Sequence, residues 1–588
     1  MTPEVSIPVP AGRTLDWRRP RAPLLFFLLV ALYLTTTAGH LFSPDEEVMF
    51  RTAESLALGR GLAIAPIAEG FSTQAGRDDR QYAQYGIGNS LLAVPWVWAG
   101  RFGARWAPAS LVAVFPQHCV LSSGRVARVY RDRDGNIFRA HDDLFFQHHH
   151  DEKDLAAWLV RARVSTLGAV TTALAATLLC LLASEIFAST RKGVGVALLY
   201  GLCTVAWPHG RTFFSEPTVV VGLLWALWRL VRADRGPART RLREFLLAGA
   251  GVGWMLLCRS DSVFLAAGLG VYAALVAAGN GTYGTHGTNR AAQPRRMRAT
   301  LAQLACFAAV PLLAIGAMLA LNYWRFGAPL STGYESQHGG FEFSTPLLYG
   351  LYGLLLSPGR SLLVYSPILI LAPWGWVLLW RRDRRLALGL CAMILLHLFA
   401  MAKWVNWGGG WDWGPRHVFQ ITPLLTLPLG ALVGARCAPY MLGLLAMLSL
   451  GMNALGILVS PIDSHLRLYQ QAYRRSGSAE YAQEFVARSV FSLKHATPIL
   501  HARLLLESED GRPTPPELGP WRPGVRPAFS DYDYDLYFIK LLRAPMGWLK
   551  WLATIPLLFT LGLGLAVAQG LRNPERRPSP CPPPPPPG

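Results

Sequence analysis

Three carboxylates, Asp45, Glu46 and Glu47, follow directly on the first apolar run of the chain, in the stretch LFSPDEEVMF (41–50). A carboxylate held in place can accept the proton of a hydroxyl nucleophile, and such general-base help is worth roughly 10²–10⁴-fold in rate. Acids in the first turn of a helix also have a purely structural use, because they cap the helix and complement its dipole. The types of Asp45, Glu46 and Glu47 are compatible with either role, and the structural alternative stays open.

The elements that must position these acids belong to a membrane protein. The 588-residue chain is 52% hydrophobic, its mean hydropathy is +0.27, and long apolar stretches recur along it. This composition excludes a soluble globular protein. We expect an all-α polytopic membrane protein of about twelve transmembrane helices, with interfacial helices in the first external loop. The first span, 23–41, follows a group of arginines and is interpreted as an uncleaved signal anchor.

The charge distribution predicts the topology. If residues 1–22 are cytoplasmic, the predicted inside segments hold 23 Lys and Arg against six Asp and Glu, which accounts for +17 of the net charge of +20. This is the positive-inside pattern, and basic residues spread over short loops argue against a nucleic-acid partner. The expected organisation is a cytoplasmic segment (1–22), a transmembrane module (23–460) with an external loop (42–163), an external segment (461–545), a last transmembrane helix (546–570) and a disordered, Pro-rich cytoplasmic tail (571–588).

A helix is predicted to begin within the acidic stretch. Ser43 is the expected N-cap, Pro44 the first helical residue and Glu46 the reciprocal partner of a capping box, and Gly59 ends the helix. We therefore expect a helix over 44–58 that lies flat on the membrane. Its apolar face would carry Met49, Ala53 and Leu56, and its polar face Glu47, Arg51 and Glu54.

A polar break, CRSD at 258–261, interrupts the apolar segment 245–278. Each half of this segment is short for a hydrocarbon core of about 30 Å. We expect a helical hairpin whose polar tip lies near one face of the membrane.

Several motifs, in this order along the chain, resemble those of the membrane-embedded GT-C glycosyltransferases. The likeness is to the family 39 branch, which includes protein O-mannosyltransferases and lipid A aminoarabinose transferases, and it covers roughly residues 20–460. An insertion at about 101–155 departs from the compact first loop expected of that family. The motifs are SPDEEVMFRTAESLALGRGL (43–62), YAQYGIGNSLLAVP (82–95), HGRTFFSEPTVVV (209–221), NYWRFGAPLSTGY (322–334), LLLSPGRSLLVYSP (354–367) and WGGGWDWGPRHVFQITP (407–423).

The resemblance implies an inverting transferase. Such an enzyme moves a sugar from a polyprenyl-phosphate-linked donor to an envelope lipid, glycan or protein at the outer face of the membrane. The acidic residue of the first external loop is the supposed catalytic base of that family, or the organiser of that base. By position it corresponds to Asp45, with Glu46 beside it.

A polyprenyl phosphate as leaving group would need cations that stabilise its developing charge. The candidates are Arg360 in SPGRS, Arg416 in WGPRH, Lys403 and Arg259. Basic side chains at helix ends also extend to lipid headgroups, and that alternative stays open for each of them.

Aromatic side chains are the candidates for substrate binding. Tyr82 and Tyr85 lie in a stretch, 78–96, that returns to the membrane, and Trp411 lies in the Trp- and Gly-rich segment 403–416. Stacking on a sugar or an isoprenoid competes here with two structural interpretations, an interfacial aromatic belt and a second interfacial helix that only packs.

Metal and cofactor signals are weak. The run AHDDLFFQHHHDEKD (140–154) offers no helical spacing that selects a ligand set, and the eight cysteines show no zinc spacing. Asp45 and Glu46 leave room for a divalent metal ion but do not require one, and no cofactor is assigned. The stretch DRDGN (132–136) is predicted to turn a hairpin between short strands at 126–130 and 137–139.

The expected localisation is the bacterial inner membrane, with the active site facing outside. The expected partners are the lipid-linked donor, an envelope acceptor and membrane lipids. A transporter or flippase of lipid-linked sugars is the main alternative, and it would need essential charges at mid-membrane, for which Arg259, Asp261 and Glu185 are the candidates. Another lipid-carrier glycan ligase, using a pyrophosphate-linked oligosaccharide, is the alternative among enzymes.

Overall fold

The computed structural model describes residues 21–64, 72–107, 118–120, 126–132, 137–139, 155–279, 293–334, 342–435, 438–506, 525–526, 536 and 549–572. Residues 1–20 and the Pro-rich tail after 572 lie outside these ranges, as does the His-rich run 140–154. The boundaries proposed above for the segments of the chain therefore remain predictions.

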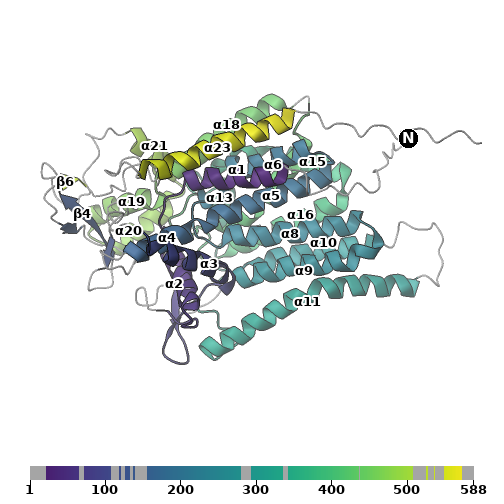
Figure 1. Ribbon diagram of the computed structural model, residues 1–588, viewed down its shortest axis with the longest axis horizontal. Helices are drawn as coiled ribbons and strands as arrows, with labels where there is room; N and C mark the ends of the chain where they lie inside the picture. Colours follow the sequence, from purple (N-terminus) through teal and green to yellow (C-terminus); the bar gives the residue numbers. More distant parts are fainter. Residues whose placement is uncertain are drawn as a thin grey trace, which may run out of the picture.

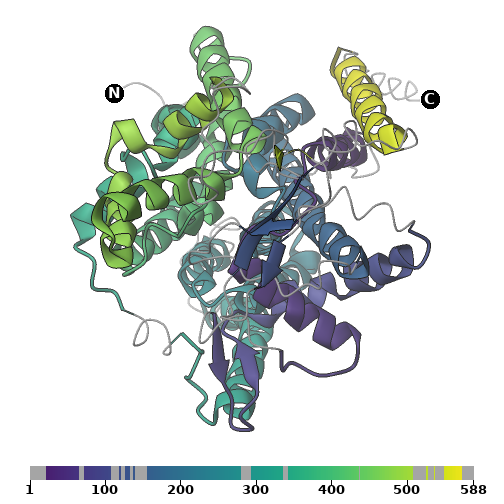
Figure 2. The same ribbon diagram turned by 90° about the vertical axis from the view of Figure 1, so that its left-hand side faces the viewer.

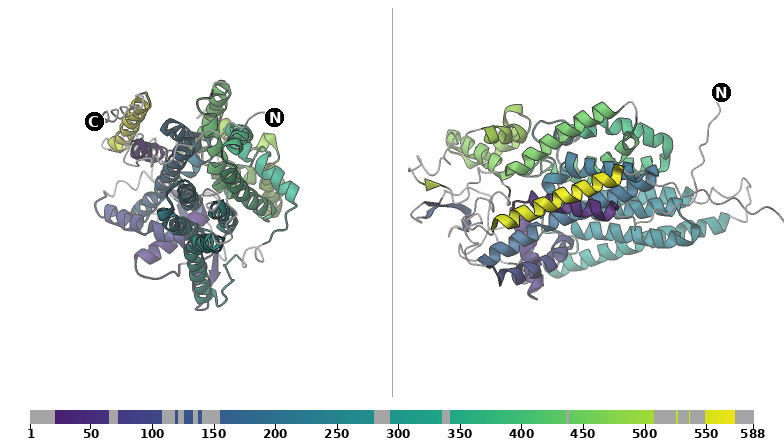
Figure 3. Two further views of the ribbon diagram at one scale, coloured as in Figure 1. Left: turned by 90° about the vertical axis from the view of Figure 1, so that its right-hand side faces the viewer. Right: turned by 45° about the horizontal axis from the view of Figure 1, so that its top comes forward.

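A bundle of long helices forms the body of the molecule, and they run along its long axis (Figures 1 and 3). Leu, Val and Ala side chains of these helices form one large buried core. The first and last described helices, α1 and α23, pack against each other at its side. The long helices are α1 (Arg21–Thr35), α5 (Leu167–Phe187), α6 (Thr190–Cys203), α8 (Glu216–Arg235), α9 (Arg241–Cys258), α10 (Ser262–Gly279), α11 (Gln293–Phe326), α16 (Arg384–Lys403), α18 (Pro439–Leu458) and α23 (Leu549–Arg572).

The described residues include five helices that are long and apolar enough to cross a membrane. The helical, polytopic character of the chain is thus confirmed, whereas the count of about twelve spans is not. The five are Leu159–Phe187, Ser262–Gly279, Pro294–Phe326, Arg384–Lys403 and Pro439–Leu458, and shorter apolar helices cover Ala22–Thr35 and Thr554–Gln569.

Two apolar stretches of the chain, 362–380 and 417–434, are among the twelve predicted spans, and prolines explain why neither is a single helix. Proline removes a backbone donor and clashes with the preceding turn, so it tends to open a new helix instead of continuing one. Pro367 opens η4 and Pro428 lies at the start of η6. The segment 362–380 is divided into α14 (Leu362–Tyr365), η4 (Pro367–Leu371) and α15 (Ala372–Arg382), and 417–434 into η5 (Arg416–Ile421), α17 (Thr422–Thr426) and η6 (Leu427–Ala431).

The predicted helical hairpin at 245–278 is confirmed as α9 followed by α10. The turn between them contains Arg259 and Asp261. α9 packs mainly on α8 and α11, whereas α10 packs mainly on α16. The polar tip is therefore held between several helices of the bundle.

The smaller elements gather at one end of the bundle, on the left of Figure 1 and toward the viewer in Figure 2. This end carries the acidic stretch, and we call it the capped end. Its helices are α2 (Pro44–Ala57), α3 (Ile87–Ala104), α4 (Leu155–Ser165), α13 (Leu347–Leu355), α19 (Pro461–Ser476), α20 (Ala479–Ser489) and α21 (Thr497–Leu506). A four-residue helix, α7 (Ala206–His209), follows α6 toward the same end.

Two small antiparallel sheets also lie at the capped end, and one of them contains the hairpin predicted from the sequence. The predicted hairpin is confirmed, because β4 (Val126–Asp132) pairs with β5 (Ile137–Arg139) with Arg131 opposite Ile137. β3 (His118–Val120) and β6 (Val525–Arg526) also pair with β4. The other sheet pairs β1 (Thr73–Ala75) with β2 (Gln81–Ala83).

The capping box of α2 is confirmed: the Ser43 side chain accepts from the Glu46 amide, and the Glu46 carboxylate accepts from the Ser43 amide. Gly59 follows with φ of +70°, as expected after a helix end. The predicted polar face of α2 does not lie open to solvent at Glu47 and Arg51. Both are buried, and Arg161 of α4 donates to Glu47 through Nη2 and Nε at 2.6 and 2.9 Å. Acidic side chains of α2 therefore attach this helix to neighbouring elements such as α4.

Close approach of α8 and α9 depends on two glycines. A Cβ on Gly222 would lie 2.7 Å from the carbonyl oxygen of Gly251, and a Cβ on Gly251 would lie 2.6 Å from the carbonyl oxygen of Gly222. Small residues at such crossings let helix backbones approach closely within a membrane.

We expect Gly251→Val to lower the free energy of unfolding by about 1–3 kcal/mol, because the added carbons force the two helices apart. Gly316 of α11 has no neighbouring heavy atom within 4 Å of its Cβ position. Gly316→Val is therefore the matched control. Thermal unfolding of both variants in one detergent measures the difference, and equal midpoints would contradict the packing argument.

Candidate functional site

Asp45 lies in the first turn of α2, with both carboxylate oxygens engaged. Arg416 Nη2 donates to Oδ2 at 2.8 Å, and the Tyr85 hydroxyl donates to Oδ1 at 2.6 Å. Ser72 is a weaker partner of Oδ1 at 3.4 Å. Burial opposes ionisation of Asp45, yet Arg416 and the Tyr85 hydrogen bond hold its pKa below the ordinary value. Asp45 is therefore a charged, fixed group at neutral pH.

Arg416, at the start of η5, contacts three carboxylates. Besides Asp45, its Nε lies 3.2 Å from Asp412 Oδ2 and 3.4 Å from Glu216 Oε1. The guanidinium also lies over the Phe214 ring, 4.5 Å from the centroid. Arg416 thereby joins the loop before η5 to α2 and to the start of α8.

Arg259, at the tip of the α9–α10 hairpin, is the second guanidinium of the site. Its Nη1 donates to Glu216 Oε1 at 2.7 Å and its Nε to Asp261 Oδ1 at 3.0 Å. Glu216 is thus shared by Arg259 and Arg416. A buried cluster of four carboxylates and two guanidiniums results, made by Asp45, Glu216, Asp261, Asp412, Arg259 and Arg416; we call it the charged cluster.

The charged cluster carries a formal excess of negative charge within the protein. Burying ions costs several kcal/mol each unless their partners are well placed, so such a cluster is a weak device for stability alone. Groups of interacting ionisable residues in partly enclosed sites are instead typical of functional sites.

Two members of the charged cluster, Glu216 and Asp412, are not among the residues predicted from the sequence. Each had a signal. Glu216 stands in Ser215–Pro217, a helix start that, like Ser43–Asp45, combines a serine, a proline and an acid, and Asp412 is the lone acid among the tryptophans of the segment 403–416. Tyr334, also missed, contacts Tyr85 edge to face at a centroid distance of 6.3 Å.

Of the predicted aromatic residues, the structure brings Tyr85 to the charged cluster and not Tyr82. The Tyr82 hydroxyl donates to Asp78 at 2.8 Å, and its ring lies edge-on to Trp324 and Phe326 at the end of α11. Tyr82 lies on β2, whereas Tyr85 lies two residues beyond the end of this strand, and the two side chains make different contacts. Its described contacts are those of a packing residue.

The two other predicted cations have different settings. Arg360 is buried beneath the loop before η5, where its Nη1 donates to the carbonyl oxygens of Asp412 and Gly414 at 2.6 and 3.1 Å. Lys403 ends α16 half-buried, and among the described residues its ammonium makes no hydrogen bond or ion pair. Arg360 therefore holds the loop in place, and Lys403 keeps its donors available.

Glu46 makes its hydrogen bonds to backbone amides and not to the guanidiniums of the charged cluster. Its carboxylate accepts from the backbone amides of Phe42, Ser43 and Phe213, and Ser43 donates at 2.9 Å. Burial raises the pKa of Glu46 to about 8, although the three amides oppose the shift. Glu46 ties the start of α2 to the segment before α8, which is the structural alternative left open for these acids.

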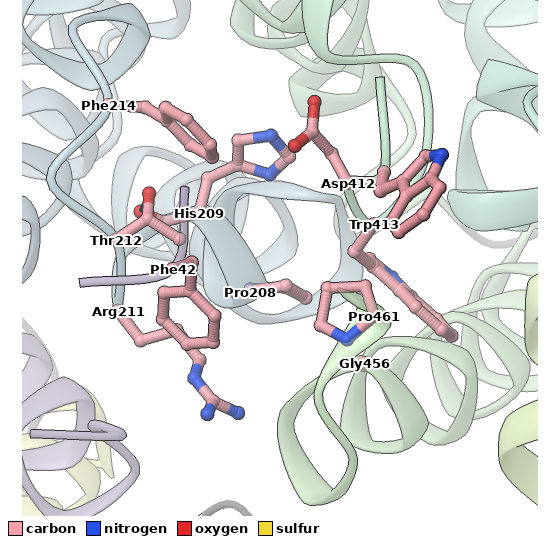
Figure 4. A pocket seen from close by; sticks show the side chains of 11 residues that line it. Phe42, Pro208, His209, Arg211, Thr212, Phe214, Asp412, Trp413, Gly456 and Pro461 are labelled. Atoms are coloured by element: carbon pink, nitrogen blue, oxygen red, sulfur yellow. Dashed lines mark hydrogen bonds between the residues drawn. The ribbon is translucent and has the colours of Figure 1, made fainter. Parts of the chain in front are cut away.

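A small cavity borders the charged cluster and is shown in Figure 4. Asp412, His209 and Phe214 lie on one side of it and Arg211 and Phe42 on the other. Trp411, the third predicted substrate-binding residue, also lines the cavity. Its ring stacks on that of His465 at a centroid distance of 6.0 Å.

Metal ligation finds no support in the described part of the chain, where no group of three or more His, Cys, Asp or Glu could hold an ion. Glu46 does not converge with Asp45 on a common point, since its oxygens bind backbone amides.

No family model matches the sequence, and no curated protein is similar to it at a significant level. The fold is similar to ArnT from Cupriavidus metallidurans bound to undecaprenyl phosphate, with 12% identity and a TM-score of 0.41 over 82% of this chain and 77% of ArnT. It is also similar to the archaeal oligosaccharyltransferase AglB from Archaeoglobus fulgidus in complex with an inhibitory peptide and a dolichol-phosphate. There the identity is 12% and the TM-score 0.40, over 83% of this chain and 56% of AglB. A likeness at this level concerns the fold alone, and no residue role is taken from it.

We expect Glu46→Ala to lower the free energy of unfolding by at least about 2 kcal/mol, because three buried amides lose their acceptor. Glu54→Ala, on the same helix and with its side chain 30% exposed, is the matched control. Thermal unfolding of the purified variants measures the effect. A Glu46→Ala protein as stable as the control would show that the amides are not dependent on this carboxylate.

Proposed function

We propose that the protein is an inverting glycosyltransferase that moves a sugar from a polyprenyl-phosphate-linked donor to an envelope lipid, glycan or protein at the outer face of the bacterial inner membrane. The observation that carries the proposal is the pairing of Asp45 with Arg416 and of Arg259 with Glu216 in one buried cluster at the capped end. A carboxylate for the acceptor proton and cations for a phosphate are what this transfer needs.

The reaction is a direct displacement. The acceptor hydroxyl oxygen attacks the anomeric carbon of the donor, the bond from that carbon to the phosphate oxygen breaks, and its electron pair stays on the phosphate. One inversion needs a proton acceptor but no carboxylate nucleophile, in contrast to a retaining glycosidase. We place Asp45 at the centre of this chemistry, as the proton acceptor or as the organiser of that acceptor.

Lys403 is the proposed first contact of the donor phosphate. Both arginines of the charged cluster already pair with carboxylates, whereas the Lys403 ammonium retains three donors with no described partner. Lys403 precedes Trp404, whose ring contacts Tyr334, and Tyr334 in turn contacts Tyr85 beside Asp45. A chain of neighbouring residues therefore links Lys403 to the charged cluster.

The transporter alternative is disfavoured by where its candidate charges lie. Arg259 and Asp261 are at the tip of a hairpin and not at the middle of a helix. Glu185 lies near the opposite end of the bundle, two residues before the end of α5, where Trp228 Nε1 donates to it at 2.9 Å. A glycan ligase with a pyrophosphate-linked donor would use the same charged cluster, so it differs only in the donor.

We expect Asp45→Asn to reduce sugar transfer by roughly 10²-fold or more, because the amide neither accepts a proton nor holds Arg416 by charge. The assay supplies labelled polyprenyl-phosphate sugars and an envelope extract to the purified protein in proteoliposomes. Glu484→Gln, an exposed acid on α20, is the control. Turnover of a folded Asp45→Asn protein at the wild-type rate would refute the assignment, and label that crosses the bilayer without transfer would favour transport.

We expect Lys403→Met to weaken the binding of polyprenyl phosphate by roughly 10–100-fold, because a hydrogen bond to a charged group contributes about 1.5–3 kcal/mol. Lys494→Met, on the exposed 3-10 turn η7 (Leu493–His495), is the control. Binding is measured by titration of the lipid into the detergent-solubilised protein. If Lys403→Met bound polyprenyl phosphate with unchanged affinity, another cation would have to bind the phosphate.

A further inference from the structure

The position of the Asp412 carboxylate is fixed by its loop and by a buried arginine. Asp412 lies in the segment 403–416, which turns at Gly409, Gly410 and Gly414 with φ of +74°, +83° and +76°. Side chains other than glycine rarely adopt such angles. Arg360 clamps the carbonyl oxygens of Asp412 and Gly414 from beneath. Backbone geometry and a buried guanidinium thus both serve to place this one acid.

The two aspartates of the charged cluster differ in what their oxygens can still accept. Both oxygens of Asp45 are taken, by Arg416 on one side and by Tyr85 and Ser72 on the other. Asp412 Oδ2 lies 3.2 Å from Arg416 Nε, yet it is buried and accepts no hydrogen bond from the described residues. Asp412 also lines the cavity that borders the charged cluster, and Asp45 does not (Figure 4).

We propose that Asp412, and not Asp45, accepts the proton of the acceptor hydroxyl, while Asp45 holds Arg416 in position beside it. The inference rests on the proposed glycosyl transfer and divides its chemistry between the two acids. The acceptor O–H bond breaks as its oxygen forms the bond to the anomeric carbon, and the proton goes to the free lone pair of Asp412. The electron pair of the broken sugar–phosphate bond leaves with the polyprenyl phosphate, and Asp412 later returns its proton to water.

The protonation behaviour of the two acids agrees with this division. Burial raises the pKa of Asp412 to about 6, with Asp45 and Glu216 adding to the shift and Arg416 and Arg360 opposing it. A base is most effective when its pKa lies near the working pH, whereas the lowered pKa of Asp45 makes that group a weaker base. Several charged and titratable groups face Asp412. They are Asp45 and Glu46 on α2, His209 and Arg211 at α7 and just after it, Glu216 on α8, Arg360 before α14, Arg416 on η5 and, across Trp411, His465 on α19.

Both histidines of that set stay neutral across the range in which Asp412 titrates. Burial lowers the pKa of His209 to about 4 and that of His465 to about 3. An acid limb near pH 6 in the rate of transfer would therefore report a carboxylate and neither imidazole.

The test is the pH dependence of kcat/KM for transfer between pH 5 and pH 9, in proteoliposomes, for wild type, Asp412→Asn, Asp412→Glu and Asp45→Asn. A base must be deprotonated to act, so the wild-type rate should fall as the pH drops below about 6. Asp412→Asn should lose roughly 10²–10⁴-fold and show no such fall. Asp412→Glu should recover part of the rate together with an acid limb. Asp45→Asn should be slow and keep the limb.

Several outcomes would overturn the inference alone, leaving the glycosyl transfer intact. They are transfer by Asp412→Asn at the wild-type rate, an acid limb that persists in Asp412→Asn, or an acid limb that Asp45→Asn abolishes. Absence of transfer by the wild type with every donor would instead refute the proposed function itself. Unchanged thermal unfolding and polyprenyl phosphate binding establish that Asp412→Asn is folded. If that variant does not fold, a pH profile of Asp412→Glu identical to that of the wild type counts against the inference.

Discussion

The contact of Arg416 with three buried carboxylates is the interaction on which the capped end depends. It joins α2, through Asp45, to the start of α8, through Glu216, and to its own loop, through Asp412. Removing a guanidinium and several carboxylates from water costs more than an apolar packing of the same volume would, so the arrangement persists only because its geometry is good. If stability were the only requirement at this place, apolar side chains such as leucine would stabilise the fold more than these charged groups do.

The three consecutive acids of α2 have different partners because helical geometry points their side chains in different directions. Successive residues are about 100° apart around the axis, so neighbouring side chains face different surroundings. Asp45 faces Arg416, Glu46 faces backbone amides and Glu47 faces Arg161. One carboxylate is thus available to the charged cluster, and the other two fix the position and tilt of the helix that presents it.

The architecture separates an apolar bundle from polar ends. Every member of the charged cluster lies at a helix start, a hairpin tip or a loop, and none lies at the middle of a long helix. Backbone groups at such places can be satisfied by side chains and water, which the interior of a membrane does not provide. The bundle therefore needs only to hold these ends together, through close packing such as that of Gly222 on Gly251.

Local features of the chain were sufficient to predict the membrane class, the capping box of α2 and the α9–α10 hairpin. Hydropathy and helix ends depend on residues only a few positions apart. The tertiary structure alone decided that Asp412 and Glu216 join Asp45, that Tyr82 packs on α11 instead, and that Arg360 supports a loop. These outcomes depend on contacts between residues separated by more than fifty positions, which no local pattern encodes. The predicted number of spans is not confirmed for a related reason, since prolines divide apolar stretches into short helices whose continuity only packing determines.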